Sequence, residues 1–418
     1  MNEIKRTKSK TKKTKHSPKN DPKTVDDRLC LTMIVKNESK IIERCLDSVK
    51  KHIDHWVIVD TGSTDGTQGI IKKHLKGIPG ELHESKFINF GHNRTESVNL
   101  SKGKGAYLLL MDADLELKVA NKNFKKEIFT EKADCYLITE CDGISKDGNH
   151  KGFNYRNRII LKNNLDWVFE GSTHEVVDLQ NSDTLRTKNY DGVWIHNRYD
   201  GGSKSEKFTR DIKLLLGDYE ENPRNDRVMF YLGESHIHLA MKHVDEGDDY
   251  SSPKCTNLLR DAIHWYKKRS EVKESWPQEV YFSLFKMAKA KTLLDGEIDT
   301  LGYLKAYNYM PSRLEPIHNI VRHCREEKLY DIGYLLGKMA IKNKKSLSKD
   351  ALFVDGNVYL YQMLDEFSIC ASWSGHNEEA IEAIETILPV IKGDVDKEVE
   401  ERIIENLKIC RNLIEKNV

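Results

Sequence analysis

Residues 107–117 read YLLLMDADLEL, a run of apolar residues that stops at two carboxylates, Asp112 and Asp114, with a single alanine between them. Such a run is typical of a buried strand. A carboxylate is costly to desolvate unless it is paired or bound to a cation, so a core strand gains no stability from this ending. The stretch therefore predicts a buried strand whose two terminal carboxylates serve a purpose other than core stability.

Strand-like and helical segments alternate before this run. Residues 29–35 (LCLTMIV) and 55–60 (HWVIVD) have strand patterns, and an amphipathic helical pattern lies between them. Repeated β-α-β units predict a mostly parallel sheet with helices on its faces, followed here by antiparallel strands after Asp114. Ligands of open α/β sheets bind at the carboxyl ends of the strands, which is where Asp60 and the Asp112/Asp114 pair fall.

A different pattern begins at about Ser205, where strand patterns give way to helical periods that continue to the end of the sequence. Helix pairs separated by segments such as NPRN and MPSRLEP suggest a unit close to the tetratricopeptide repeat of about 34 residues. The segment KHVDEGDDYSSPKC interrupts this spacing and is expected to be an insertion. The sequence thus predicts a basic tail at residues 1–27, an α/β domain at 28–204 and an all-α repeat domain at 205–418.

Composition excludes some classes of protein. Lys and Arg number 67 against 66 Asp and Glu in 418 residues, so no global field attracts nucleic acid or an anionic membrane. The tail is rich in lysine and poor in large apolar residues, so it is expected to be disordered and solvated. Contact with an acidic surface, or a localisation signal, is the alternative interpretation of the tail.

The cysteines and the apolar segments indicate the cellular compartment of the protein. Eight cysteines are scattered without a C-x-x-C pair, which is typical of a reducing compartment. No signal-peptide pattern and no stretch of about 20 apolar residues is found. We therefore expect a cytoplasmic protein without a membrane span.

The D-x-D spacing at the end of a strand has a chemical meaning. Two carboxylates can hold a divalent cation, and hard oxygen ligands suit Mg²⁺ or Mn²⁺, which would neutralise a bound diphosphate. Carboxylates after a strand also cap turns, which is the structural alternative. The motif alone does not decide between these two uses.

Several motifs in order make a more specific pattern. IVKNES, IVDTGSTDGT, FGHNRTESVNLSKGKGAYLLLMDAD, WVFEGSTHEVV and WIHN together resemble the family 2 glycosyltransferases of the GT-A fold, over roughly residues 29–199. The following segments, IHNRYDGGSKSEKFTRDIKLLL, FYLGES and ALFVDGNVYLYQMLDEFSICASWSG, resemble bacterial-type family 2 transferases with a C-terminal tetratricopeptide-like domain.

The resemblance implies a nucleotide-sugar site. Glu38 and Asp60 would contact the nucleoside, and the Asp60 carboxylate can accept the imide N–H of uracil. This sequence has Thr61 where many relatives carry a second acid. Arg94 would reach the donor, since a guanidinium suits phosphate, although an arginine on a surface helix is the alternative. Asp65 is expected to cap the helix that follows it.

The resemblance also implies a cation and a base. Asp112 and Asp114 would bind the cation and the diphosphate, and His196 in WIHN would be a further metal ligand, with a structural histidine as the alternative. Glu175 in GSTHEVV would be the general base, because inversion needs a carboxylate on the acceptor side of the anomeric carbon. The neighbouring His174 would orient Glu175 or bind the acceptor, or would simply be packed.

These expectations combine into a predicted enzyme. It is an inverting, metal-dependent, hexosyltransferase-like enzyme that moves a sugar from a nucleoside-diphosphate sugar, in particular a UDP-sugar, to a protein, peptide or glycan. The helical domain would present the acceptor or support a homodimer. The main alternative is a helical-repeat adaptor with an inactive transferase domain. A sugar nucleotidyltransferase fits less well, because IVKNES has no glycine to receive a triphosphate.

Overall fold

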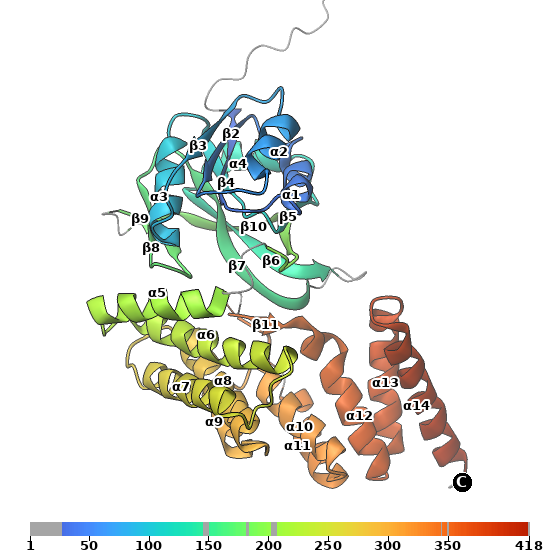
Figure 1. Cartoon of the computed structure of the whole chain (residues 1–418). Coiled ribbons are helices and arrows are strands. Elements are labelled where there is room, and N and C mark those ends of the chain that lie inside the picture. Colours follow the sequence, from blue (N-terminus) through green and yellow to red (C-terminus); the bar gives the residue numbers. More distant parts are fainter. Residues whose placement is uncertain are drawn as a thin grey trace, which may run out of the picture.

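The computed structural model describes residues 27–144, 150–180, 184–201, 207–343, 345–348 and 351–416. An α/β part and a stack of helices lie one against the other, with α5 and β11 of the helical part facing the sheet (Figure 1). All of the predicted basic tail except Asp27 lies outside the described residues, and so does the predicted boundary between residues 204 and 205.

The first half of the α/β part is a parallel sheet with connecting helices, as predicted. β1 pairs in parallel with β2 and β4, and β2 with β3. The strands are β1 (Leu29–Val35), β2 (His55–Asp60), β3 (Gly80–Glu84) and β4 (Tyr107–Leu110), and the helices are α1 (Ile42–Val49), α2 (Thr67–His74) and α3 (Phe90–Leu100).

The strands after the D-x-D motif extend this sheet and pair mostly antiparallel, as predicted, but residues 187–197 pair in parallel with residues 135–144. The strand order is β3-β2-β1-β4-β7-β6-β10-β5, and β7 is antiparallel to both β4 and β6. The added elements are β5 (Leu115–Val119), α4 (Phe124–Glu131), β6 (Cys135–Ile144), β7 (His150–Lys162) and β10 (Thr187–Asn197). A separate two-stranded sheet consists of β8 (Trp167–Glu170) and β9 (Val176–Leu179).

Burial explains why these strands are nearly continuous apolar runs. Leu31 and Met33 of β1 belong to one core cluster, whereas Cys30 belongs to a second cluster that also holds Val57 and Leu108. Both faces of the central strands are therefore covered, as expected for a parallel sheet with helices on each side. This packing fixes the carboxyl ends of β1, β2 and β4 at one edge.

The helical part is a succession of packed helices. They are α5 (Lys207–Glu221), α6 (Asp226–Asp245), α7 (Pro253–Ser270), α8 (Pro277–Asp295), α9 (Thr300–Tyr309), α10 (Glu315–Glu326), α11 (Tyr330–Lys342), a π-helical turn (Val358–Gln362), α12 (Met363–Trp373), α13 (Asn377–Ile391) and α14 (Lys397–Lys416). Each helix packs on the next along most of the chain, which agrees with the predicted repeat architecture. The predicted insertion, residues 242–255, comprises the end of α6, the short connection at residues 246–252 and the start of α7.

The prediction that strand patterns end with the first domain is wrong in one place. β11 (Val354–Asp355), within the helical part, pairs antiparallel with β7 of the sheet. The buried Arg313 holds the preceding segment, since its Nη1 donates to the Leu352 carbonyl over 2.8 Å. Two residues are too few to produce a strand periodicity, so the sequence pattern could not reveal this link.

Two further findings concern the cysteines and the length of the apolar helices. All eight cysteines are buried free thiols. Among the helices that the structure describes, we find none with the length and apolar character that a membrane span requires.

Candidate active site

Asp60 lies at the carboxyl end of β2 and is 1% exposed. Its Oδ1 accepts hydrogen bonds from the backbone N–H groups of Gly62, over 2.8 Å, and Ser63, over 2.7 Å. Its Oδ2 is buried and accepts no hydrogen bond from any residue that the structure describes. A buried carboxylate oxygen without a donor is costly, so this atom is suited to a ligand that brings a donor.

The loop after β1 brings Glu38 to the same edge, because Val35 and Asp60 are register partners. The Glu38 N–H donates to the Thr67 hydroxyl over 2.9 Å, which ties this loop to the start of α2. The cap residue of α2 is Gly66 and not, as had been predicted, Asp65; Asp65 instead accepts the Thr67 N–H over 3.1 Å from one position earlier. Desolvation raises the pKa of Asp65, but its hydrogen bonds with Thr67 and Ser39 outweigh this effect and lower the pKa overall.

The Arg94 guanidinium contacts two other predicted site residues, Asp112 and Glu175. Its Nη2 lies 2.7 Å from Oδ1 and 2.8 Å from Oδ2 of Asp112, and its Nε forms an ion pair with Glu175 Oε1. The side chains of Arg94 and Glu175 are 17% and 12% exposed, whereas that of Asp112 is 41% exposed. Burial opposes the charge on Arg94, but the two carboxylates raise its pKa overall. The residues come from α3, the tip of β4 and the loop before β9.

Asp114 lies beyond Asp112 in the turn between β4 and β5. Burial raises the pKa of Asp114, and the negative charge of Asp112 adds to this effect. Gly201 approaches closely, since a Cβ atom there would lie 3.2 Å from Asp114 Oδ2. A bound cation would reduce the repulsion between these two carboxylates, one of which is poorly solvated. Their hard oxygen atoms fit Mg²⁺ or Mn²⁺ if substrate phosphates and water complete the ligand set.

His196 is placed differently from its predicted role. It lies on β10 opposite Glu116 of β5, and burial and the charge of Arg198 lower its pKa. Within the described part of the chain, no group of three or more His, Cys, Asp or Glu residues could hold a metal ion. The structure therefore does not bring His196 together with Asp112 and Asp114 as a three-ligand cluster.

Glu140 of β6 is a buried carboxyl group that the sequence analysis missed. Its Oε1 accepts from Asn197 Nδ2 over 2.6 Å. Burial raises the pKa of Glu140 and outweighs its hydrogen bonds with Tyr155 and Asn197. The charges of Asp112 and Asp114 act in the same direction, so Glu140 lies within their field. A charged residue inside the apolar pattern YLITEC was the only signal in the sequence.

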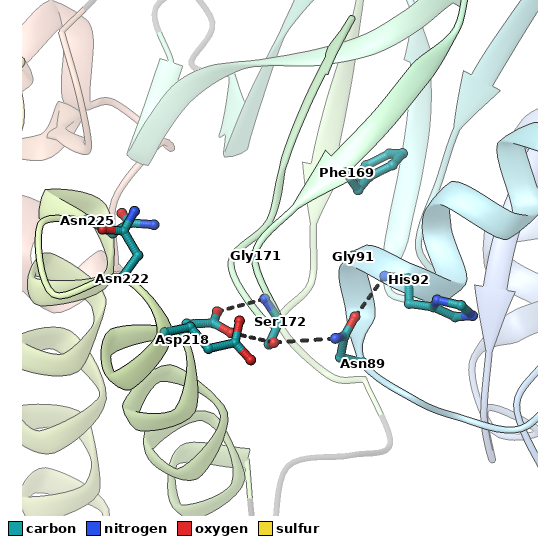
Figure 2. Close-up of a pocket in the computed structure, with 10 residues that line it drawn as sticks. Asn89, Gly91, His92, Phe169, Gly171, Ser172, Asp218, Asn222 and Asn225 are labelled. Carbon is teal, nitrogen blue, oxygen red and sulfur yellow. Dashed lines mark hydrogen bonds between the residues drawn. The ribbon is translucent and has the colours of Figure 1, made fainter. Parts of the chain in front are cut away.

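A polar cavity of about 340 Å³ lies beside the loop that carries Glu175, between the two domains. Figure 2 shows Asn89, which caps α3, and His92 of α3 on one side, Ser172 in the middle, and Asp218 of α5 on the other side. Asp218 was not among the residues predicted from the sequence.

The sequence of residues 30–172 matches the family model described as glycosyl transferase family 2. This segment is a family 2 glycosyltransferase domain. The match confirms the resemblance drawn from the ordered motifs. Asp60, Arg94, Asp112 and Asp114 lie within the matched range, whereas Glu175 lies just beyond it.

Individual proteins are also similar to this chain. The glycosyltransferase SunS of Bacillus subtilis is 26% identical over 246 residues, which are 56% of this chain and 53% of SunS. A TPR repeat-containing protein of Synechococcus elongatus is 33% identical over 154 residues, which are 36% of each protein. This chain therefore spans about half the length of SunS and about a third of the cyanobacterial protein.

Among solved structures, residues 1–349 of TarS from S. aureus in complex with UDP-GlcNAc are 14% identical to this chain. The similarity covers 65% of this chain and 92% of that one, with a TM-score of 0.32.

Proposed function

We propose that the protein is an inverting glycosyltransferase that moves a sugar from a UDP-sugar to a nucleophile on a protein, peptide or glycan. The observation that carries the proposal is the Arg94 guanidinium, which contacts both Asp112 and Glu175. One charged group thereby links the proposed donor side of the site to the proposed base. The family of the N-terminal domain supports the same reaction class.

The nucleoside would bind at the carboxyl ends of β1 and β2. The free Oδ2 of Asp60 would accept the imide N–H of uracil, which would satisfy an otherwise unpaired buried oxygen. Glu38, on the adjacent loop, would contact the same nucleoside. TarS, whose structure contains UDP-GlcNAc, is one similar protein that binds such a donor.

The diphosphate would bind at the tip of β4. Asp112 and Asp114 would hold a Mg²⁺ or Mn²⁺ ion, and the ion would supply positive charge to the departing diphosphate. Arg94 carries a second positive charge at the same place. Since Arg94 contacts Asp112 in this structure, donor phosphates would compete with Asp112 for the guanidinium.

Glu175 would act as the general base. As the acceptor nucleophile forms its bond to the anomeric carbon, the bond from that carbon to the diphosphate oxygen breaks, and the proton of the nucleophile passes to Glu175. The ion pair with Arg94 holds this carboxylate beside the donor site. Attack from the face opposite the diphosphate gives inversion at the anomeric carbon.

The acceptor and the compartment belong to the same proposal. Stacked helix pairs bind polypeptides in other proteins, so a protein or peptide acceptor on the helical part is proposed. Eight buried free thiols support a reducing compartment such as the cytoplasm.

The test is release of UDP from a panel of UDP-sugars in the presence of Mn²⁺. We expect release by the wild type and loss of at least 100-fold in the Glu175→Gln and Asp114→Ala variants, since each removes a group that acts on the reacting bond. Glu43→Gln, on the exposed side of α1, is the control of equal charge change. Absence of UDP release from every donor would favour an adaptor with an inactive transferase domain.

A further inference from the structure

The loop between β8 and β9, residues 171–175, ends at the proposed base Glu175. Three consecutive residues of this loop, Ser172, Thr173 and His174, contact the helical domain. The base itself points the other way, to Arg94. The contacts therefore lie directly beside the residue whose position matters for proton transfer.

Helix α5 holds the first two of these residues. The Ser172 N–H donates to Asp218 Oδ2 over 2.8 Å, and its hydroxyl donates to Asp218 Oδ1 over 2.6 Å (Figure 2). Both carboxylate oxygens of Asp218 are thus used on one loop residue. The Thr173 hydroxyl lies 3.4 Å from Oδ1 of Asp211, which is fully buried in the same helix.

Helix α6 holds the third residue. Arg227 donates to the His174 carbonyl from Nε over 3.3 Å and from Nη2 over 3.2 Å. Arg227 is itself fixed, because its Nη1 donates to Glu279 of α8 over 3.2 Å. The His174 ring stacks on Tyr231 with ring centres 4.0 Å apart and an angle of 8°.

The backbone of His174 explains how neighbouring side chains face opposite domains. Its φ angle is 51°, a left-handed conformation that costs a non-glycine residue about 1 kcal/mol or more. The carbonyl contact with Arg227 and the ring contact with Tyr231 hold the residue in this conformation. The next residue, Glu175, then points back to Arg94.

The transferase domain supplies the other wall of the loop. The Phe90 N–H at the start of α3 donates to the Ser172 carbonyl over 3.0 Å. Gly91 allows this contact, since a Cβ atom there would lie 2.4 Å from the Gly171 carbonyl oxygen. The loop is therefore enclosed by α3 on one side and by α5 and α6 on the other.

We propose that the helical domain positions the catalytic base, with Asp218 and Arg227 holding the loop so that Glu175 reaches the acceptor. This inference rests on the proposed function. A base must be held within a fraction of an ångström of its working position, and misplacement by about 1 Å can cost 100-fold in rate. Asp218 and Arg227 do not touch the reacting atoms, so they are positioning residues.

The kinetic test compares Asp218→Asn and Arg227→Met in the full-length protein. We expect kcat for UDP-sugar turnover to fall at least 10-fold, while KM for the donor changes less than about twofold, because the donor site is left intact. Glu220→Gln and Arg224→Met are matched controls, since both residues are exposed and lie close by in sequence. Arg227→Lys keeps the charge and one donor and should recover part of the rate.

A double-mutant cycle shows whether the effect passes through the base. In a Glu175→Gln background, Asp218→Asn should cause no further loss of kcat, because there is no base left to misplace. A loss of the same size in both backgrounds would overturn the inference. Variants that keep kcat within about twofold of the controls would overturn it as well.

Hydrogen exchange separates this inference from the proposed function. The Ser172 amide donates to Asp218, so its exchange should accelerate in Asp218→Asn and in Arg227→Met but not in the two controls. If the wild type releases no UDP, the proposed reaction is wrong. Hydrogen exchange at Ser172 then still tests whether Asp218 and Arg227 fix the β8–β9 loop. Unchanged exchange at Ser172 would then refute that hold.

Discussion

Replacement of Arg94 by methionine tests the link at the centre of the site. The substitution keeps an unbranched side chain of similar length but leaves Asp112 and Glu175 without their shared cation. Glu175 is 12% exposed, so it would become a mostly buried and uncompensated charge. We therefore expect Arg94→Met to destabilise the fold as well as to lower activity.

The magnitude follows from the two contacts. Breaking a buried ion pair by removing one partner costs about 3–5 kcal/mol, and the Glu175 contact belongs to this class. Asp112 is 41% exposed, so its contact is screened by water and adds no more than about 1 kcal/mol. We expect the free energy of unfolding to fall by about 3–6 kcal/mol, measured by urea denaturation.

A second substitution distinguishes loss of the Arg94–Glu175 ion pair from unspecific destabilisation of the fold. Glutamine at position 175 removes the charge that Arg94→Met leaves unpaired, so Arg94→Met/Glu175→Gln should be more stable than Arg94→Met alone by about 2 kcal/mol. Arg224→Met, at an exposed arginine, is the control and should change stability by less than about 0.5 kcal/mol. Additive effects of the two substitutions would refute the view that Arg94 and Glu175 act on each other.

Three further predictions concern the nucleoside, the cation and acid stability. Asp60→Asn should weaken UDP binding at least 10-fold in calorimetry, because an amide nitrogen can replace the free acceptor oxygen; unchanged affinity would contradict the uracil contact. Chelation of divalent cations should abolish UDP binding by the wild type, and Asp114→Ala should bind weakly even with Mn²⁺ present; metal-independent binding would contradict the cation site. Burial, together with the charges of Lys207 and Arg227, lowers the pKa of His174 to about 3, despite opposition from Glu234. As the pH falls, the His174 side chain is protonated in the unfolded chain before it is protonated in the folded protein, so the free energy of unfolding falls by about 1 kcal/mol from pH 7 to 5.5. His174→Phe should therefore show a shallower decline in Tm over this range, and an equally steep decline would contradict the role of His174.

Local patterns predicted the parts of the site that lie at strand tips. The run before Asp112 identified a buried strand, and the β-α-β order placed Asp60 and Asp112 at one edge, since parallel strands share the direction of their carboxyl ends. Such positions follow from periodicity and connectivity. They need no knowledge of distant contacts.

Contacts between distant segments could not be predicted in this way. No periodicity states that Arg94 of α3 pairs with Glu175, or that β11 joins β7. Asp218 and Arg227 were missed for a related reason, since charged residues on amphipathic helices are usually solvated. Only the packing of the two domains turns these side chains toward the β8–β9 loop.

The small sheet next to the proposed base is short and depends on its neighbours. β8 and β9 have four residues each and, among the strands that the structure describes, pair only with one another. An isolated hairpin of this kind is marginally stable in water. Trp167 at the start of β8 is buried against the transferase core, which anchors one end of the hairpin. The loop at the other end depends on α3, α5 and α6. We therefore expect the position of Glu175 to depend on the joined domains, and a transferase domain without α5 and α6 would keep the proposed donor residues but lose one wall of the β8–β9 loop.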